Sequence, residues 1–256
     1  MAKKGMVKTA FVTPDKHFPI HCQKAINIVC KAIEIAKPNI YIDLGDTGEW
    51  ELFSNHHWKT RDKPPADILN PMRKKSVKEV NKHMDQIDNS LDKAKCTERH
   101  FMQGNHEVWL DNVALKEDRP EYETYTALKL KQRGYKYYPY KQRKVLQIGK
   151  MLFTHGKYTG KYHTFAHIDK YGKNIMYGHT HDLQRFTKTE YEKTTSAWSM
   201  GCLKDIEKDE DWLLGRPVNW NHGFALVHFW SNGNFIVEVV EILKGKTIFR
   251  GEEIKG

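Results

Sequence analysis

The strongest constraint on the fold is a series of short apolar segments, each followed directly by polar residues of metal-binding types. Residues 9–13, 40–44 and 99–103 have the length and the apolar character of buried strands. Between the first two segments, residues 21–36 carry apolar side chains at helical spacing, and Pro38 ends that pattern. This alternation of strand and helix predicts βα units with parallel strands in the first part of the chain.

Two further helices are predicted, from about residue 73 to 93 and from 121 to 132. Residues 59–71 contain three prolines, which we expect to exclude a continuous helix or a central strand there. No repeat, low-complexity tract or Gly/Ser-rich linker marks a domain boundary. We therefore expect one domain over residues 1–256, with a long insertion near residues 50–98.

The later part of the chain is rich in strands and turns. A hairpin is expected over residues 145–154, with Gly149 and Lys150 at its turn. Four more strands follow, at residues 196–200, 223–230, 235–243 and 247–250. A mostly antiparallel sheet after βα units predicts an α/β fold with two sheets face to face and helices outside.

Composition excludes several classes of protein. Hydrophobic residues make up 39% and charged residues 29%, which is too apolar for a disordered chain and too polar for a membrane bundle. No segment has the roughly 18 uncharged residues of a membrane-spanning helix, and no apolar stretch follows the first lysines. The four cysteines show no C-x-x-C spacing. We expect a protein of the reducing cytoplasm, without membrane contact.

Polar blocks with metal-ligand chemistry stand at the ends of five predicted strands. Loops at strand ends collect ligands in open α/β sheets, so these blocks are expected to converge on one site. Carboxylate, amide oxygen and imidazole together suit first-row divalent metals, and seven such ligands suit two ions that share a bridging carboxylate. The blocks are Asp15-Lys16-His17, Gly45-Asp46, Gly104-Asn105-His106-Glu107, Thr154-His155-Gly156 and Gly178-His179-Thr180-His181.

The order D-x-H, G-D, G-N-H-[DE], H and G-H-x-H resembles the motifs of the calcineurin-like metallophosphoesterases. These motifs extend from Asp15 to His181, about two thirds of the chain. The resemblance is nearest to compact single-domain members, including nucleases and phage-encoded phosphoesterases. It implies a four-layer sandwich of two mixed sheets flanked by helices, and a metal-dependent phosphoric ester hydrolase.

The resemblance also implies a role for each matching residue. Two divalent ions are expected, with Mn preferred and Fe, Zn, Ni or Co as alternatives, and they would activate a water molecule as the nucleophile. His106 would not bind metal but would protonate the leaving oxygen as the general acid. Glu49 stands where some members of the family keep an acid that orients this histidine. The implied ligands are Asp15, His17 and His181 for the first ion, Asp46 as the bridge, and Asn105, His155 and His179 for the second.

Departures from the family's subgroups restrict the substrate. The serine/threonine protein phosphatases carry one arginine after the G-D block and another just before G-N-H-E, and these hold a dianionic monoester. Here no arginine follows Asp46 in the motif, and Gln103 precedes Gly104. Without that bidentate contact a phosphate monoester is held less well, which argues against a protein phosphatase.

The charge favours nucleic acid as the substrate. The net charge is +10, and residues 129–144 contain seven lysines or arginines, no acid and four interleaved tyrosines. A solvated helix face beside an aromatic hairpin edge is the alternative explanation of this segment. We expect DNA slightly more than RNA. The residues predicted to bind substrate are Lys136, Lys141, Arg143 and Lys157.

Several alternatives stay open at this point. A phosphomonoesterase or a cyclic-nucleotide phosphodiesterase would use the basic face only to attract small anions, and an inactive binding scaffold is a third possibility. Glu107 is either a hydrogen-bond partner behind the ligands or only an acid at a helix start. His163 and His167 are either surface histidines or an extra metal pair. The oligomeric state is undetermined.

Overall fold

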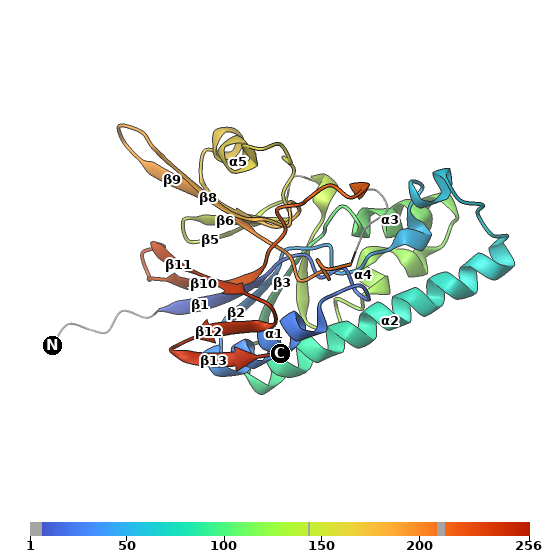
Figure 1. Cartoon of the computed structure of the whole chain (residues 1–256), viewed down its shortest axis with the longest axis horizontal. Helices are drawn as coiled ribbons and strands as arrows, with labels where there is room; N and C mark the ends of the chain where they lie inside the picture. Colours follow the sequence, from blue (N-terminus) through green and yellow to red (C-terminus); the bar gives the residue numbers. More distant parts are fainter. Residues whose placement is uncertain (1–6, 143, 209–212) are drawn as a thin grey trace.

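The computed structural model describes residues 7–142, 144–208 and 213–256 (Figure 1). Within them, two mixed sheets pack face to face between layers of helices, which confirms the predicted fold class. The first sheet has six strands in the order β11-β10-β1-β2-β3-β4. Their bounds are β1 Lys8–Thr13, β2 Ile40–Asp43, β3 Glu98–Met102, β4 Tyr135–Tyr138, β10 His222–Phe229 and β11 Phe235–Ile242.

The second sheet has five strands in the order β5-β6-β7-β9-β8. Strands β6, β7 and β9 are parallel, and β5 and β8 are antiparallel at the two edges. A separate hairpin, β12 (Lys246–Phe249) and β13 (Glu252–Lys255), lies beside α1. The five strands are β5 Leu146–Ile148, β6 Met151–Thr154, β7 Asn174–Tyr177, β8 Leu183–Thr189 and β9 Thr194–Met200.

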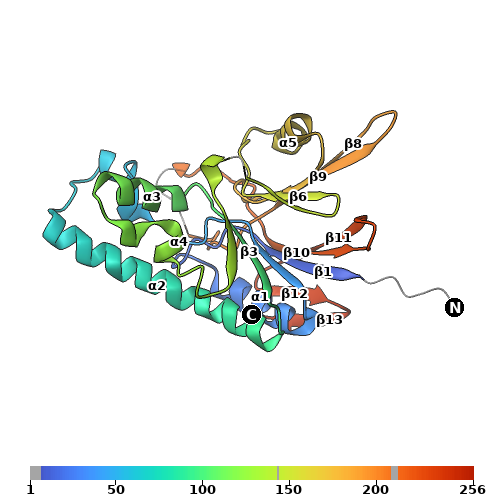
Figure 2. The same ribbon diagram turned by 180° about the vertical axis from the view of Figure 1, so that it is seen from behind.

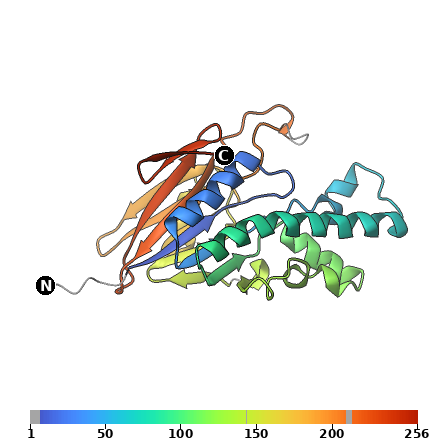
Figure 3. The same cartoon turned by 90° about the horizontal axis from the view of Figure 1, so that it is seen from below.

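The helices form the outer layers. Helices α1 (Gln23–Ala36) and α2 (Ala66–Lys93) lie side by side across the outer face of the first sheet (Figure 3). Helix α5 (His163–Tyr171) covers the outer face of the second sheet (Figure 2). Helices α3 (Glu107–Lys116) and α4 (Thr124–Ala127) follow β3 in the chain and lie near the carboxyl ends of the parallel strands of the first sheet. None of the described helices is long and apolar enough to cross a membrane.

Three hydrophobic cores separate the four layers. Alternation along β1 shows how the sequence builds them, because Phe11 packs against the helices whereas Ala10 and Val12 pack against the second sheet. A smaller core joins α5 to the outer face of the second sheet through Ile168 and Tyr177. The strand periodicity of the sequence therefore corresponds directly to the layers.

Two predicted helices differ from the structure. Helix α2 begins at Ala66 and includes Pro71, although three prolines were expected to exclude a helix there. Pro71 has no N–H to donate to the carbonyl of Asp67, one turn earlier. Both residues are exposed, so water can bind to that carbonyl. The helix predicted at 121–132 is reduced to α4, because Lys129 has a left-handed φ of 54°.

The C-terminal strands also differ from the expectation of one antiparallel sheet. Strand β10 pairs antiparallel with β1, and β11 follows at the edge, so both extend the first sheet. This return of the chain brings the loop before β10 to the same end of the molecule as the carboxyl end of β1. The consequence for the site is that a segment near residue 220 can reach it.

A buried ionic cluster fixes α2 to the amino ends of β3 and β4. Asp88 accepts hydrogen bonds from Arg99, from Arg133 and, at 2.9 Å, from the Tyr135 hydroxyl. The Asp88 side chain is 10% exposed, whereas that of Asp92, which also pairs with Arg99, is 68% exposed. Arg133 is thus part of the fold, although it belongs to the basic segment expected to meet nucleic acid.

We expect Asp88→Ala to lower the free energy of unfolding by about 3–5 kcal/mol, because it leaves two buried guanidinium groups without their shared partner. Urea denaturation measures the effect. Asp92→Ala is the matched control and should cost less than about 1 kcal/mol, since its carboxylate is mostly exposed. Equal losses in the two variants would contradict this role for Asp88.

Candidate metal centre

Parallel strands in both sheets bring the five polar loops together. Strands β1, β2 and β3 are adjacent and parallel, so the loops that follow them lie at one edge of the first sheet. Strands β6 and β7 are adjacent and parallel in the facing sheet. The hydrogen bond from the Gly178 N–H to the His155 carbonyl, 3.0 Å long, joins the two loops that follow them.

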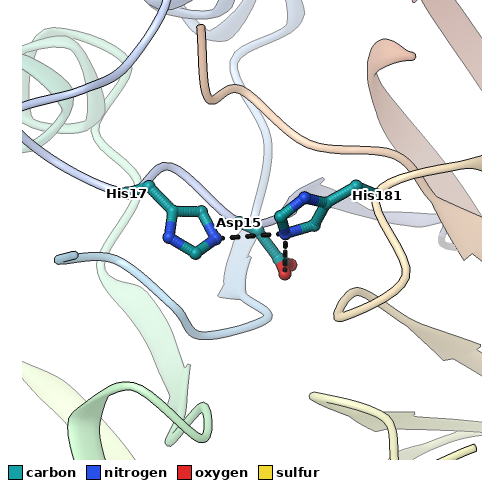
Figure 4. A group of neighbouring side chains, drawn as sticks. All are labelled: Asp15, His17 and His181. Carbon is teal, nitrogen blue, oxygen red and sulfur yellow. Dashed lines mark hydrogen bonds and ion pairs between the residues drawn. The ribbon is translucent and has the colours of Figure 1, made fainter. Parts of the chain in front are cut away.

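The first group of ligand atoms comes from Asp15, His17 and His181, all buried (Figure 4). The Nε2 atoms of the two histidines are 3.1 Å apart, and Nε2 of His181 is 3.3 Å from Oδ2 of Asp15. His17 donates from Nδ1 to the Glu49 carboxylate at 2.7 Å, which leaves its Nε2 lone pair directed into the group.

The second group contains Asp46, His155 and His179. Nε2 of His155 is 3.2 Å from Oδ2 of Asp46 and 2.9 Å from Oδ1 of Asn105. The same Asp46 oxygen is 3.9 Å from Nε2 of His17, so this carboxylate lies between the two groups. The structure thus brings together all seven residues that the sequence predicts as ligands, with Asp46 in the position of a bridge.

The chemistry of these residues fits divalent cations. Oδ1 of Asp15 is buried without a hydrogen-bond partner among the described residues, so it has a free acceptor position. Burial lowers the pKa of His17 and of His179 to about 4, which keeps both imidazoles neutral and able to bind metal. Burial opposes charge on His155, but the carboxylates of Asp46 and Asp15 raise its pKa to about 10. These carboxylates therefore strongly favour a positive charge between them.

Unusual backbone conformation is concentrated at the same residues. Four of the seven have left-handed φ angles: His17 52°, Asp46 46°, His179 72° and His181 62°. Each such residue costs roughly 1–3 kcal/mol, and such strain persists where the surrounding structure enforces it, commonly at functional sites. The ligand loops are therefore held in conformations that the chain would not adopt by itself.

Glycines in the motifs have a steric reason. A Cβ atom on Gly178 would lie 2.0 Å from Oδ1 of Asp15, and one on Gly104 would lie 2.1 Å from Oδ1 of Asp46. Only glycine permits the two loops to approach these carboxylates so closely. Glycine at 104 and 178 is thus required by the positions of Asp15 and Asp46.

Glu107 resolves one of the alternatives left by the sequence. It begins α3, and its fully buried carboxylate also accepts five hydrogen bonds behind the ligands. Burial and the nearby charge of Asp46 raise its pKa to about 7, and the hydrogen bonds act in the opposite direction. The donors are the N–H groups of Asp46, Thr47, Gly48 and Gly104, at 2.9 to 3.2 Å, and Nε1 of Trp50 at 3.1 Å.

Glu49 lies at the site. The sequence predicted that its carboxylate orients His106, but the structure shows no hydrogen bond between the two. The carboxylate accepts from His17 and, at 3.2 Å, from Lys204, and it is 3.9 Å from Nδ1 of His106. His106 donates instead to the main-chain carbonyl of Glu49 at 2.7 Å. His17, Glu49 and His106 also form a third cluster of possible metal ligands. We assign Glu49 to the orientation of His17, because His17 and Lys204 both bond to its Oε2.

No protein-family model matches the sequence, and no curated protein matches it. Among solved structures, vacuolar protein sorting 29 from Cryptosporidium parvum is 13% identical, with a TM-score of 0.52 over 98% of this chain and 100% of that one. The chain has the calcineurin-like metallophosphoesterase fold.

Two further solved structures resemble the chain more weakly. The Entamoeba histolytica Vps29 single mutant D62A is 12% identical over 97% of this chain and 99% of that one, with a TM-score of 0.44. The Pseudomonas putida nuclease MPE is 12% identical over 90% of this chain and 87% of that one, with a TM-score of 0.32. Within the metallophosphoesterase fold, the geometry of this chain's own residues therefore carries the argument.

Helix α5 supports the predicted ligand loops of the second sheet from behind. His163 and His167 are buried, so the alternative that they are surface histidines is wrong. His163 lies 2.6 Å from the Tyr177 hydroxyl and 3.0 Å from the Asp182 carboxylate, the residues that flank the loop 178–181. His167 accepts from the Lys157 N–H at 3.2 Å, just after the His155 loop. Both histidines use these ring nitrogens in bonds within the fold, which also argues against an extra metal pair.

The predicted substrate-binding residues are divided between several surroundings. Lys136 is exposed on β4, and Lys141 donates to Asn112 at 2.9 Å. The Lys157 ammonium lies 4.8 Å from the centre of the Tyr140 ring, which is itself 5.7 Å from His155. Arg143 lies outside the described residues. Of the three that the structure describes, Lys157 is therefore the one beside the metal centre.

We expect Asp46→Asn to reduce metal occupancy at both groups, because the amide weakens the oxygen that lies between them. Metal content per chain, measured by atomic spectroscopy after dialysis, tests this. Asp85→Asn, an exposed change on α2, is the control and should leave the content unchanged. A wild-type metal content in Asp46→Asn would show that Asp46 is not shared.

We expect His163→Phe to weaken metal binding by roughly 10- to 100-fold, because it keeps an aromatic ring but removes the bonds to Tyr177 and Asp182. Calorimetric titration of the metal-free protein with Mn²⁺ measures this. The matched control is His228→Phe, at the far end of β10, which should bind as the wild type does. Unchanged affinity in His163→Phe would mean that α5 does not position the loop.

Proposed function

We propose that the chain is a cytoplasmic, metal-dependent phosphodiesterase that cleaves nucleic acid. The observation that carries this proposal is the complete set of seven predicted ligand residues with His106 beside them, buried or half-buried after the ends of parallel strands. An inactive descendant has no chemical reason to keep strained backbone and buried carboxylates at these positions. Two divalent ions, with Mn as our first choice, would polarise the phosphate and offset the charge that develops during cleavage.

His106 has the surroundings of a general acid. Its main-chain N–H donates to the Asp46 carboxylate at 2.9 Å, and its Nδ1 donates to the Glu49 main-chain carbonyl at 2.7 Å. These two bonds fix the ring orientation and leave Nε2 to carry a proton toward a leaving oxygen. The ring packs on Trp109 at a centroid distance of 4.1 Å, which restricts its rotation.

The surroundings of the motif loops support a diester in preference to a monoester. Gln103, which stands where the protein phosphatases have arginine, is buried and donates to Asp111 and Thr124. Trp50 is also buried, and its indole N–H donates a hydrogen bond to Glu107. Neither residue can provide a guanidinium contact to a dianionic phosphate, so a phosphate with a single negative charge fits better.

The basic segment supports a smaller nucleic-acid surface than the sequence suggested. Two of its residues belong to the interior and cannot contact nucleic acid, since Arg133 is bound to Asp88 and Tyr135 is buried. Its carboxyl-terminal part reaches the rim of the metal centre, where Lys144 and Lys157 line a small cavity with Tyr140 beside His155. We place the phosphate-binding cations there, with DNA preferred to RNA.

We expect the protein with Mn²⁺ to cleave DNA or RNA, single- or double-stranded, and a chromogenic phosphodiester, with loss of activity in EDTA. His106→Ala should lower the rate by roughly 10²–10⁴-fold while both metals stay bound, because only proton transfer is removed. His228→Ala is the control and should keep full activity. Loss of metal in His106→Ala would identify His106 as a ligand.

Two results would replace the proposed substrate. Activity confined to a small monoester or a cyclic nucleotide would favour the phosphomonoesterase or cyclic-nucleotide phosphodiesterase and make the charge of +10 incidental. No hydrolysis of any ester by metal-loaded protein would favour a binding scaffold.

A further inference from the structure

A row of five aromatic rings extends along the side of the metal centre that includes His17. His17 is its middle member, with His106 on one side and His181 on the other. Each end of the row is a tryptophan that is neither fully buried nor fully exposed. The order is Trp109, His106, His17, His181 and Trp220, with successive ring centroids 4.1, 4.8, 4.9 and 4.9 Å apart.

The two tryptophans come from separate parts of the fold. Trp109 is in the first turn of α3, three residues after His106, and packs partly against the core beneath the first sheet. Trp220 is in the loop before β10, and it is not a member of the hydrophobic cores that the described residues form. Its contact with a predicted ligand histidine is therefore not explained by packing of the core.

We propose that Trp220 and Trp109 stack against planar groups on the two ester arms of the substrate, which selects phosphodiesters that carry nucleobases. This inference rests on the proposed phosphodiesterase function. Trp109 adjoins the predicted general acid and so lies toward the leaving arm, and Trp220 adjoins His181 and lies toward the other arm. Stacking on a tryptophan face is tolerant of base identity, because every base has a π-face.

The tyrosines of the basic segment are less suited to this role. Tyr135 is buried and hydrogen-bonded to Asp88, and Tyr138 bonds to His100. Tyr140 donates its hydroxyl to the Gly156 carbonyl, and a lysine ammonium lies near its ring as one does near the ring of Trp220, with Lys157 4.8 Å and Lys204 6.0 Å from the respective ring centres. The stacking function that the sequence suggested for these tyrosines is therefore assigned to the tryptophans, and Lys157 remains a phosphate-binding cation.

Two diesters with the same leaving group separate stacking from chemistry. Methyl p-nitrophenyl phosphate and thymidine 5′-(p-nitrophenyl phosphate) differ only in the arm that stays on the phosphate. With Mn²⁺-loaded wild-type protein we expect a KM about tenfold lower for the thymidine ester, the effect of one base stack. The values of kcat should be similar, because binding of the base adds no contact to the reacting atoms.

Trp220→Ala should raise the KM of the thymidine ester about tenfold relative to the KM of the methyl ester, so that the preference for the thymidine ester disappears. Trp220→Phe should recover most of the difference, since it restores a ring. Trp109→Ala should raise KM for both esters, because both carry the nitrophenyl arm. Trp230→Ala is the matched control, an exposed tryptophan at the opposite end of β10.

The outcomes distinguish the two proposals. Hydrolysis of both esters with equal KM, or a Trp220→Ala variant with wild-type constants for the thymidine ester, would overturn the stacking platform and leave the phosphodiesterase intact. No hydrolysis of either ester would overturn the proposed function itself. To distinguish a polynucleotide from a single nucleotide as the natural source of the base, the same variants are compared on an oligonucleotide with and without an abasic position.

Discussion

Two carboxylates buried close together determine much of the site. Asp15 and Asp46 are almost completely inaccessible, and one oxygen of Asp15 has no hydrogen-bond partner among the described residues. Such charges cannot be buried without compensation, so every neighbouring element supplies positive charge, a donor or space. Imidazoles surround the carboxylates, main-chain N–H groups donate to them, and glycines replace side chains that would collide with them.

The arrangement that satisfies these carboxylates uses both sheets. Strands of the first sheet carry Asp15 and Asp46, and strands of the second carry His155 and the loop 178–181. Each half has a buried polar residue behind it: Glu107 holds the loops of the first sheet, and His163 holds the loop of the second. The metal centre is therefore a contact between the two sheets, and its geometry depends on how they pack.

The surroundings of the centre differ in character on its two sides. Beside His155 lie a tyrosine and a lysine already in contact with each other, which suits phosphate. Along the row that includes His17, the outer members are tryptophans, which suits flat apolar groups. The lysine beside His155 and the tryptophans at the ends of the row are the two features on which the proposed nucleotide substrate rests.

Local patterns in the sequence were sufficient to predict the strands of the βα units and the five polar blocks that meet at the site, because each block follows a strand and parallel strands end at one edge. The contacts of Glu49 with His17 and Lys204, of His163 with the second sheet's loop, and of Trp220 with His181 could be found only from the folded chain. These partners are far apart in sequence and carry no local periodicity. Their contacts arise when β10 returns to β1 and the two sheets pack, which no local pattern specifies.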